Sequence, residues 1–143
     1  MAHFATTIES TLAPADAFAY MADFANAARW DPSVSRAERV GDGPIGAGSE
    51  FDLVARFGGK DVPLRYTAVE HEPPGRVVLE AHRPGFTSRD TITIAAAGSG
   101  STVHYDAVLA FSGLRRLLDP LMGLLFSRVG ARAAAGLRAE LNP

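Results

Sequence analysis

The sequence predicts an α+β fold in which a curved antiparallel sheet of about seven strands wraps around one long C-terminal helix. From residue 34 to residue 111, apolar and polar residues alternate in segments that are separated by turn-forming residues. Strands that follow one another without an intervening helix pair as antiparallel neighbours. Beyond this region, apolar residues recur every three or four positions, which is the spacing of an amphipathic helix.

Composition indicates one domain with a complete apolar core. The chain has 143 residues, of which 47% are apolar, and we treat residues 1–143 as a single domain. A formal net charge of −2 does not attract the negatively charged phosphate backbone of a nucleic acid, so we expect no nucleic-acid partner. The lack of cysteine excludes disulfides and thiolate chemistry.

The sequence predicts neither a secretory signal nor a transmembrane segment. Its N-terminus has no basic stretch followed by an apolar run. The most apolar tract, residues 117–126, contains Asp119 and Pro120 and is much shorter than the ~20 residues that cross a bilayer. We therefore expect a cytoplasmic protein.

One strand and two short helices are expected first. Residues 3–11 alternate loosely and are rich in β-branched and aromatic side chains, which favours a strand. Pro14 suits the first turn of a helix because it has no N–H group to leave unpaired. Residues 26–32 predict a second short helix, which ends at Asp31-Pro32 because the residue before a proline avoids the helical conformation.

The next part of the chain predicts a run of strands. Expected strands begin at Val34 and then cover residues 50–57, 62–69, 76–82, 86–96 and 103–111. Turns are expected at 58–59, 71–75, 83–85 and 98–100. The alternation is cleanest in the last strand, where Tyr105 and Leu109 share the apolar face and His104 takes the opposite one. This sheet is therefore expected to bury one face and to expose the other.

The final segment predicts a helix from Pro120 to Leu141. Asp119 can cap its free N–H groups while Pro120 occupies the first turn. Its apolar stripe comprises Met122, Leu125, Val129, Ala133, Gly136 or Leu137, and Leu141. Small residues on or beside the stripe have two interpretations: they leave empty space between the helix and the sheet, or they let the helix pack closely against its neighbours. They are Gly123, Gly130, Ala133 and Gly136.

A pocket is expected between the sheet and this helix. A sheet of this size twists and curls, and one narrow helix does not cover its concave face completely. The side chains predicted to line or cap the pocket come from the apolar faces of the elements above. They are Trp30, Phe51, Leu53, Tyr66, Phe86, Tyr105, Leu109, Leu121, Leu125 and Val129.

Several segments, in this order and spacing, resemble the SRPBCC superfamily and, more narrowly, its polyketide cyclase/dehydrase-like branch. The matching segments are residues 8–26, 30–34, 46–51, 66–76 and 98–105. The resemblance implies the START-like helix-grip fold, with an elongated cavity between sheet and helix. It also implies a hydrophobic ligand, because members bind lipids, sterols, plant hormones, quinones or polyketides, and a minority catalyse cyclisation or dehydration. The matched segments carry no catalytic signature.

Four polar residues are weak catalytic candidates: Tyr66, His82, Arg89 and Asp90. His82 could act as a general base if it points inward, whereas an exposed imidazole is the alternative. The hydroxyls of Tyr66 and Tyr105 could orient a ligand or pair with the backbone or a buried water.

Asp90 and Ser88 share a strand face with the apolar residues that follow them, so both are expected to point inward. For Asp90, an ion pair with Arg65 or Arg89 at the sheet rim is expected in preference to catalysis. Neither a metal nor another cofactor is expected, because the four histidines lack metal-ligand spacing.

These observations favour the binding, and by extension the transport, of a small hydrophobic or amphipathic molecule. The alternative is a cyclase or dehydratase in which His82 is the base. A third option is an interaction module with a full core, and a homodimer is left open. The leucines at 114, 117 and 118 fit either a partner surface or a cavity lid.

Overall fold

The computed structural model describes residues 2–57, 59–113 and 119–143, with side chains for residues 2–56, 59–113 and 123–143. Its elements follow the predicted order of strand, short helices, strands and long helix. They are β1 (Ala2–Ser10), α1 (Pro14–Ala22), η1 (Phe24–Asn26), α2 (Ala27–Trp30), β2 (Val34–Val40), β3 (Glu50–Phe57), β4 (Lys60–Glu72), β5 (Arg76–Arg83), β6 (Phe86–Ala97), β7 (Gly100–Phe111) and α3 (Asp119–Glu140).

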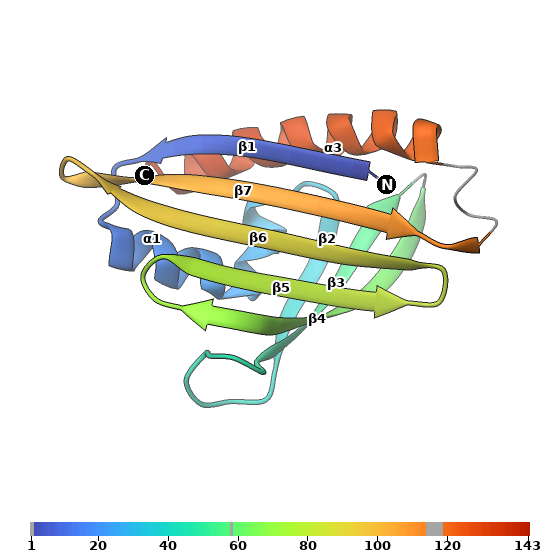
Figure 1. Ribbon diagram of the computed structural model, residues 1–143, viewed down its shortest axis with the longest axis horizontal. Coiled ribbons are helices and arrows are strands. Elements are labelled where there is room, and N and C mark those ends of the chain that lie inside the picture. Colours follow the sequence, from blue (N-terminus) through green and yellow to red (C-terminus); the bar gives the residue numbers. More distant parts are fainter. Residues whose placement is uncertain (1, 58, 114–118) are drawn as a thin grey trace.

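The strands form one seven-stranded antiparallel sheet in the order β1-β7-β6-β5-β4-β3-β2. In Figure 1, β2 and β3 run steeply across the direction of β1, β7 and β6, so the sheet is strongly curled. The helix α3 packs mainly against β1 and α2. The predicted helix-grip architecture is therefore confirmed.

Strand alternation places side chains as the sequence predicts. In β7, Tyr105 and Leu109 are buried whereas His104 is exposed and bonds to Thr7. Several boundaries differ from the prediction by one to three residues, and β4 differs at both ends: it begins at Lys60 and continues to Glu72 instead of covering residues 62–69. A bulge after Ala68 shifts the register, and pairing with β5 then resumes, so the break is limited to the turn itself.

Two glycines bring α3 close to its neighbours. A Cβ atom at Gly136 would lie 2.0 Å from the carbonyl oxygen of Trp30, and one at Gly130 would lie 2.4 Å from the ring of Phe4. At these two positions the small residues serve close packing and do not leave space. Gly123 differs, because its Cβ would meet nothing within 4 Å.

A Gly136→Ala substitution is expected to lower the free energy of unfolding by about 1–3 kcal/mol, because the new methyl group collides with backbone that must shift. Gly123→Ala is the matched control on the same helix. It is expected to raise the free energy of unfolding by up to about 1 kcal/mol, since alanine favours helix and the space is open. Urea denaturation measures both, and two changes of the same sign would contradict this packing.

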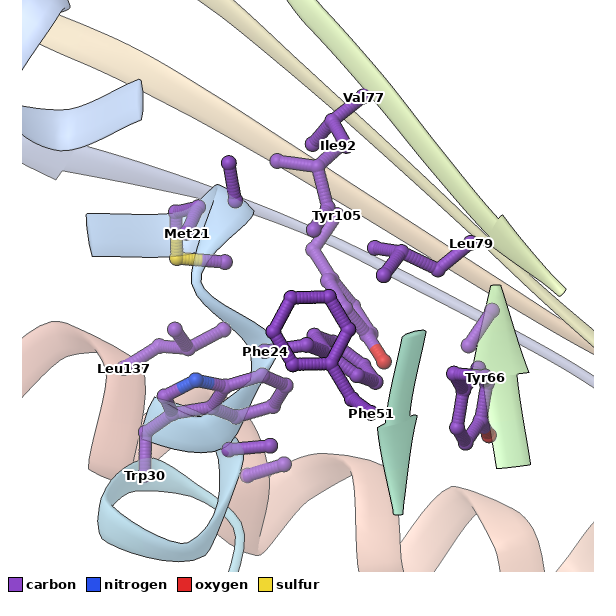
Figure 2. Packing of buried hydrophobic residues seen from close by; sticks show 14 of the residues in the cluster. Met21, Phe24, Trp30, Phe51, Tyr66, Val77, Leu79, Ile92, Tyr105 and Leu137 are labelled. Atoms are coloured by element: carbon purple, nitrogen blue, oxygen red, sulfur yellow. The ribbon is translucent and has the colours of Figure 1, made fainter. Parts of the chain in front are cut away.

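An aromatic cluster fills the space between the sheet and the helices (Figure 2). The ring of Phe24 makes edge contacts with Trp30, Phe51 and Tyr66 at centroid distances of 6.2, 6.4 and 5.0 Å. Trp30 in turn meets Tyr105 at 5.4 Å. The short segment η1–α2 therefore covers one side of the interior with the rings of Phe24 and Trp30.

Candidate functional site

A cavity of about 50 Å³ lies beside this aromatic cluster, under α3. Its volume corresponds to space for a few water molecules. The wall is formed by residues of η1–α2 and the turn after it, five strands and α3: Phe24, Ala27, Trp30, Asp31, Ser33, Val34, Leu53, Ala55, Leu64, Tyr66, Ser88, Asp90, Tyr105, Ala107, Leu109, Phe126 and Val129. The interior is thus packed more fully than the sequence led us to expect.

A buried hydrogen-bonded group occupies one side of the cavity. The Tyr105 hydroxyl donates to Oδ2 of Asp90 at 2.6 Å, and the hydroxyls of Tyr66 and Ser88 lie 2.8 Å apart. Ser88 also bonds to the Asp90 carboxylate. We call these four residues the polar cluster. All four are buried, so the interior holds one connected polar group among apolar side chains.

Strand geometry explains how these residues meet. In β6, Ser88 and Asp90 point to the same face as the buried Ile92, because alternate residues of a strand share a face. β6 pairs with β7 so that Asp90 lies opposite Ala107, and Tyr105 lies opposite Ile92, one inward position along. The tyrosine ring reaches diagonally across that spacing to the carboxylate.

Burial raises the pKa of Asp90 to about 7, because the interior disfavours the charged form. Hydrogen bonds from Tyr105 and Ser88 oppose this shift, and the nearby charge of Asp31 adds to it. Burial likewise raises the pKa of Tyr66 and of Tyr105, and the charge of Asp90 raises both further. The tyrosine hydroxyls therefore keep their protons.

Asp31 is a second carboxyl on the cavity wall, which the sequence analysis assigned only to a helix end. It accepts hydrogen bonds from the backbone N–H and the hydroxyl of Ser33, at 2.9 and 2.7 Å. Burial nevertheless raises its pKa. The spacing Asp31-Pro32-Ser33 after a buried tryptophan was the available signal, since an aspartate that bonds two residues onward forms a turn and stays fixed in place.

The expected ion pair of Asp90 does not form, and this prediction was wrong. Arg65 pairs with Asp52 at 2.7 Å, and Arg89 pairs with Glu80. Both arginines are neighbours in sequence of inward residues, so alternation places them on the exposed face. The carboxyl group of Asp90 is instead held by hydroxyl groups in the interior.

The four catalytic candidates separate into two pairs. Tyr66 and Asp90 lie in the polar cluster, whereas His82 and Arg89 lie on the outer face of the sheet. The His82 side chain is 68% exposed, and its Nε2 is 3.3 Å from a carboxylate oxygen of Glu80. His82 therefore does not point into the cavity, as a catalytic base there would have to.

Six of the predicted pocket residues meet at the cavity: Trp30, Leu53, Tyr66, Tyr105, Leu109 and Val129. The other described ones do not line it. Phe51 is fully buried in the core, Phe86 packs against the ring of Phe111, and Leu125 is half-buried on α3. The side chain of Leu121 and residues 114, 117 and 118 lie outside the described residues.

Phe24 and Phe126 line the cavity although the sequence analysis did not name them. Phe126 comes directly after Leu125, a residue of the apolar stripe, so helical spacing alone could have predicted that it lies near the cavity. Phe24 lies in a 3-10 turn, where no periodicity indicates which way a side chain points.

Larger hollows lie on the outer surface, but they lack such a polar group. One of about 540 Å³ lies against the outer face of β2–β4, where charged residues pair with each other, as Arg36 does with Glu38. Another of about 490 Å³ lies beside α1 and is mainly apolar. Among the helices that the structure describes, none is long and apolar enough to span a membrane.

Residues 1–142 match a family model described as polyketide cyclase/dehydrase and lipid transport. Among curated proteins, none matches the sequence significantly. Three solved structures share the fold at low identity. TTHA0849 from Thermus thermophilus has a TM-score of 0.77 and 18% identity, over 98% of this chain and 95% of its own.

The second is a START superfamily protein from Mycobacterium smegmatis, with a TM-score of 0.76 and 13% identity, over 97% of this chain and 96% of its own. The third is the Zhui aromatase/cyclase from Streptomyces sp. R1128, with a TM-score of 0.73 and 12% identity, over 97% of this chain and 92% of its own. With the family match covering nearly every residue, the chain belongs to the polyketide cyclase/dehydrase and lipid transport family.

Proposed function

We propose that this protein binds a small amphipathic molecule in the cavity between the sheet and α3. The observation that carries the proposal is the polar cluster of Tyr66, Ser88, Asp90 and Tyr105, which is buried in an otherwise apolar wall. Ligand pockets typically combine apolar walls with a few polar groups that fix orientation. Membership of a family that includes lipid transport supports the same function.

The small cavity volume restricts the ligand and its route. A guest larger than a few waters needs wall residues to move, since the cavity measures about 50 Å³. Phe126 and Val129 are the wall residues on α3, and both are only half-buried. Their rotation displaces fewer contacts than movement of the core rings, so we place the entry beside them.

Binding is tested by titration with lipids, quinones, aromatic polyketides and single-ring aromatic compounds. Tyr66→Phe is expected to weaken binding of a hydroxylated ligand about two- to tenfold, because one hydrogen-bonding group is lost. Tyr20→Phe is the matched control, since the Tyr20 hydroxyl bonds to Glu140 outside the cavity. No saturable binding by any compound, or equal effects of the two variants, would count against the proposal.

The position of Asp90 also favours a second candidate, a cyclase or dehydratase. A carboxyl group with a pKa of about 7 can accept and return a proton near neutral pH, and two tyrosine hydroxyls lie beside it. In this function Asp90 takes the role that the sequence analysis gave to His82.

Turnover of a polyketide-like substrate tests the second candidate. Asp90→Asn is expected to abolish turnover, whereas His82→Ala is expected to leave it unchanged, because His82 lies on the outer face. Binding without turnover of any substrate in the panel would leave ligand binding as the function.

A further inference from the structure

Every charged side chain on the described cavity wall is a carboxylate. Asp31 and Asp90 are the carboxylic acids there, and the described wall contains no lysine, arginine or histidine. The two carboxyls are close enough for the charge of Asp31 to act on Asp90. A bound anion would therefore meet negative charge with no cation to offset it.

The hydroxyl groups of the wall direct their protons toward these two carboxylates. Tyr105 donates to Asp90, and Ser33 donates to Asp31. Above its pKa of about 7, Asp90 is ionised and only accepts; where Ser88 donates its one proton to it, Tyr66 donates to Ser88. All four hydroxyl protons are thus used within the wall.

The cavity wall therefore offers a ligand hydrogen-bond acceptors rather than donors. The indole N–H of Trp30 is the remaining side-chain donor among the described wall residues. In Figure 2 its nitrogen lies on the side of the ring toward Leu137, away from the tyrosine hydroxyls. A ligand that needs hydrogen-bond donors finds none in the polar cluster, whereas a ligand that supplies them finds several acceptors.

Positive charge near the cavity lies in a separate hollow. Arg56 and Arg132 line a space of about 180 Å³ that shares only Ser33 and Val129 with the cavity wall. Arg56 already pairs with Asp61 at 3.1 Å. These arginines are therefore not among the residues that line the cavity itself.

From this geometry we infer that the cavity selects small neutral or cationic compounds that carry hydroxyl or amino groups and rejects carboxylates. The inference rests on the proposed binding function and names the ligand class for that site. Asp90 and Asp31 are the specificity-determining residues, since they bring both the negative charge and the acceptors. Free fatty acids and other carboxylates are excluded by the same two groups.

Three ligands of similar size test the inference: benzyl alcohol, benzylamine and benzoate. Binding is followed by NMR at pH 8, where Asp90 with a pKa of about 7 is mostly ionised. Backbone amides of Ser88, Asp90 and Tyr105 report the cavity, so only shifts there are counted. We expect benzyl alcohol and benzylamine to bind at least tenfold more tightly than benzoate, because like charges repel strongly in a desolvated site.

Asp90→Asn removes the buried charge and keeps an acceptor for Tyr105. It is expected to narrow the ratio of benzyl alcohol to benzoate affinity at least fivefold. Asp52→Asn is the control, because Asp52 lies on the outer face of the same sheet and pairs with Arg65. If Asp90→Asn does not fold, Asp31→Asn serves in its place with the same expected direction.

The outcomes separate this inference from the proposed function. Benzoate that binds in the cavity as tightly as benzyl alcohol would overturn the inference and leave the binding function intact. A ratio that is unchanged in the Asp90 or Asp31 variant would also overturn it. If none of the three compounds and none of the wider panel shifts these amides, the binding function itself fails, and the inference fails with it.

Discussion

Replacing Trp30 with alanine is expected to lower the free energy of unfolding by about 3–5 kcal/mol, the range for large aromatic residues in a core. Trp30 is 2% exposed, and its ring contacts Phe24 and Tyr105. Its carbonyl oxygen lies where Gly136 allows α3 to approach. The side chain therefore joins η1 to β7, and the backbone of the same residue meets α3.

Urea denaturation measures this loss, and Leu124→Ala is the control. Leu124 is a large apolar residue on α3 that is 61% exposed, so its removal is expected to change the free energy of unfolding by less than about 0.5 kcal/mol. A loss below about 1 kcal/mol for Trp30→Ala would show that neighbouring rings fill the vacated space. The cavity wall described above would then be incorrect.

The second large effect is a loss of stability with rising pH that depends on Asp90. Its folded-state pKa of about 7 lies above the unfolded value of about 3.9. The folded protein therefore favours the protonated form, and this contribution is fully present below about pH 4. It is lost as the pH rises through about 7, and a shift of about 3 units at about 1.4 kcal/mol per unit gives about 4 kcal/mol.

Comparison with Asp90→Asn isolates this contribution, because the amide stays neutral at every pH. The free energy of unfolding of the variant minus that of the wild type is expected to increase between pH 4 and 7 and then to level off. Asp52→Asn, which replaces a carboxylate on the outer face that pairs with Arg65, provides the reference curve. A difference that stays constant from pH 4 to 8 would mean that Asp90 is solvated and does not face the cavity.

The direction in which each strand residue points was predictable, because backbone geometry alone makes successive side chains alternate between the two faces of a sheet. Tyr66, Ser88, Asp90 and Tyr105 point inward and His104 points outward, as the two-residue alternation predicts. The same rule places both arginines that were expected to pair with Asp90 on the outer face. The predicted ion pair is wrong because it rested on proximity in the sequence and not on strand parity.

The sequence by itself determined the order of elements, the antiparallel sheet, the long helix and the set of inward residues, since each depends on local periodicity. Only the tertiary structure decided which inward residues meet. Strand register brings Tyr105 to Asp90, the turn after α2 brings Asp31 to the same cavity, and Gly136 lets α3 close on Trp30 until about 50 Å³ remains. These outcomes depend on register, sheet curl and side-chain volume across segments far apart in the chain, which no local pattern records.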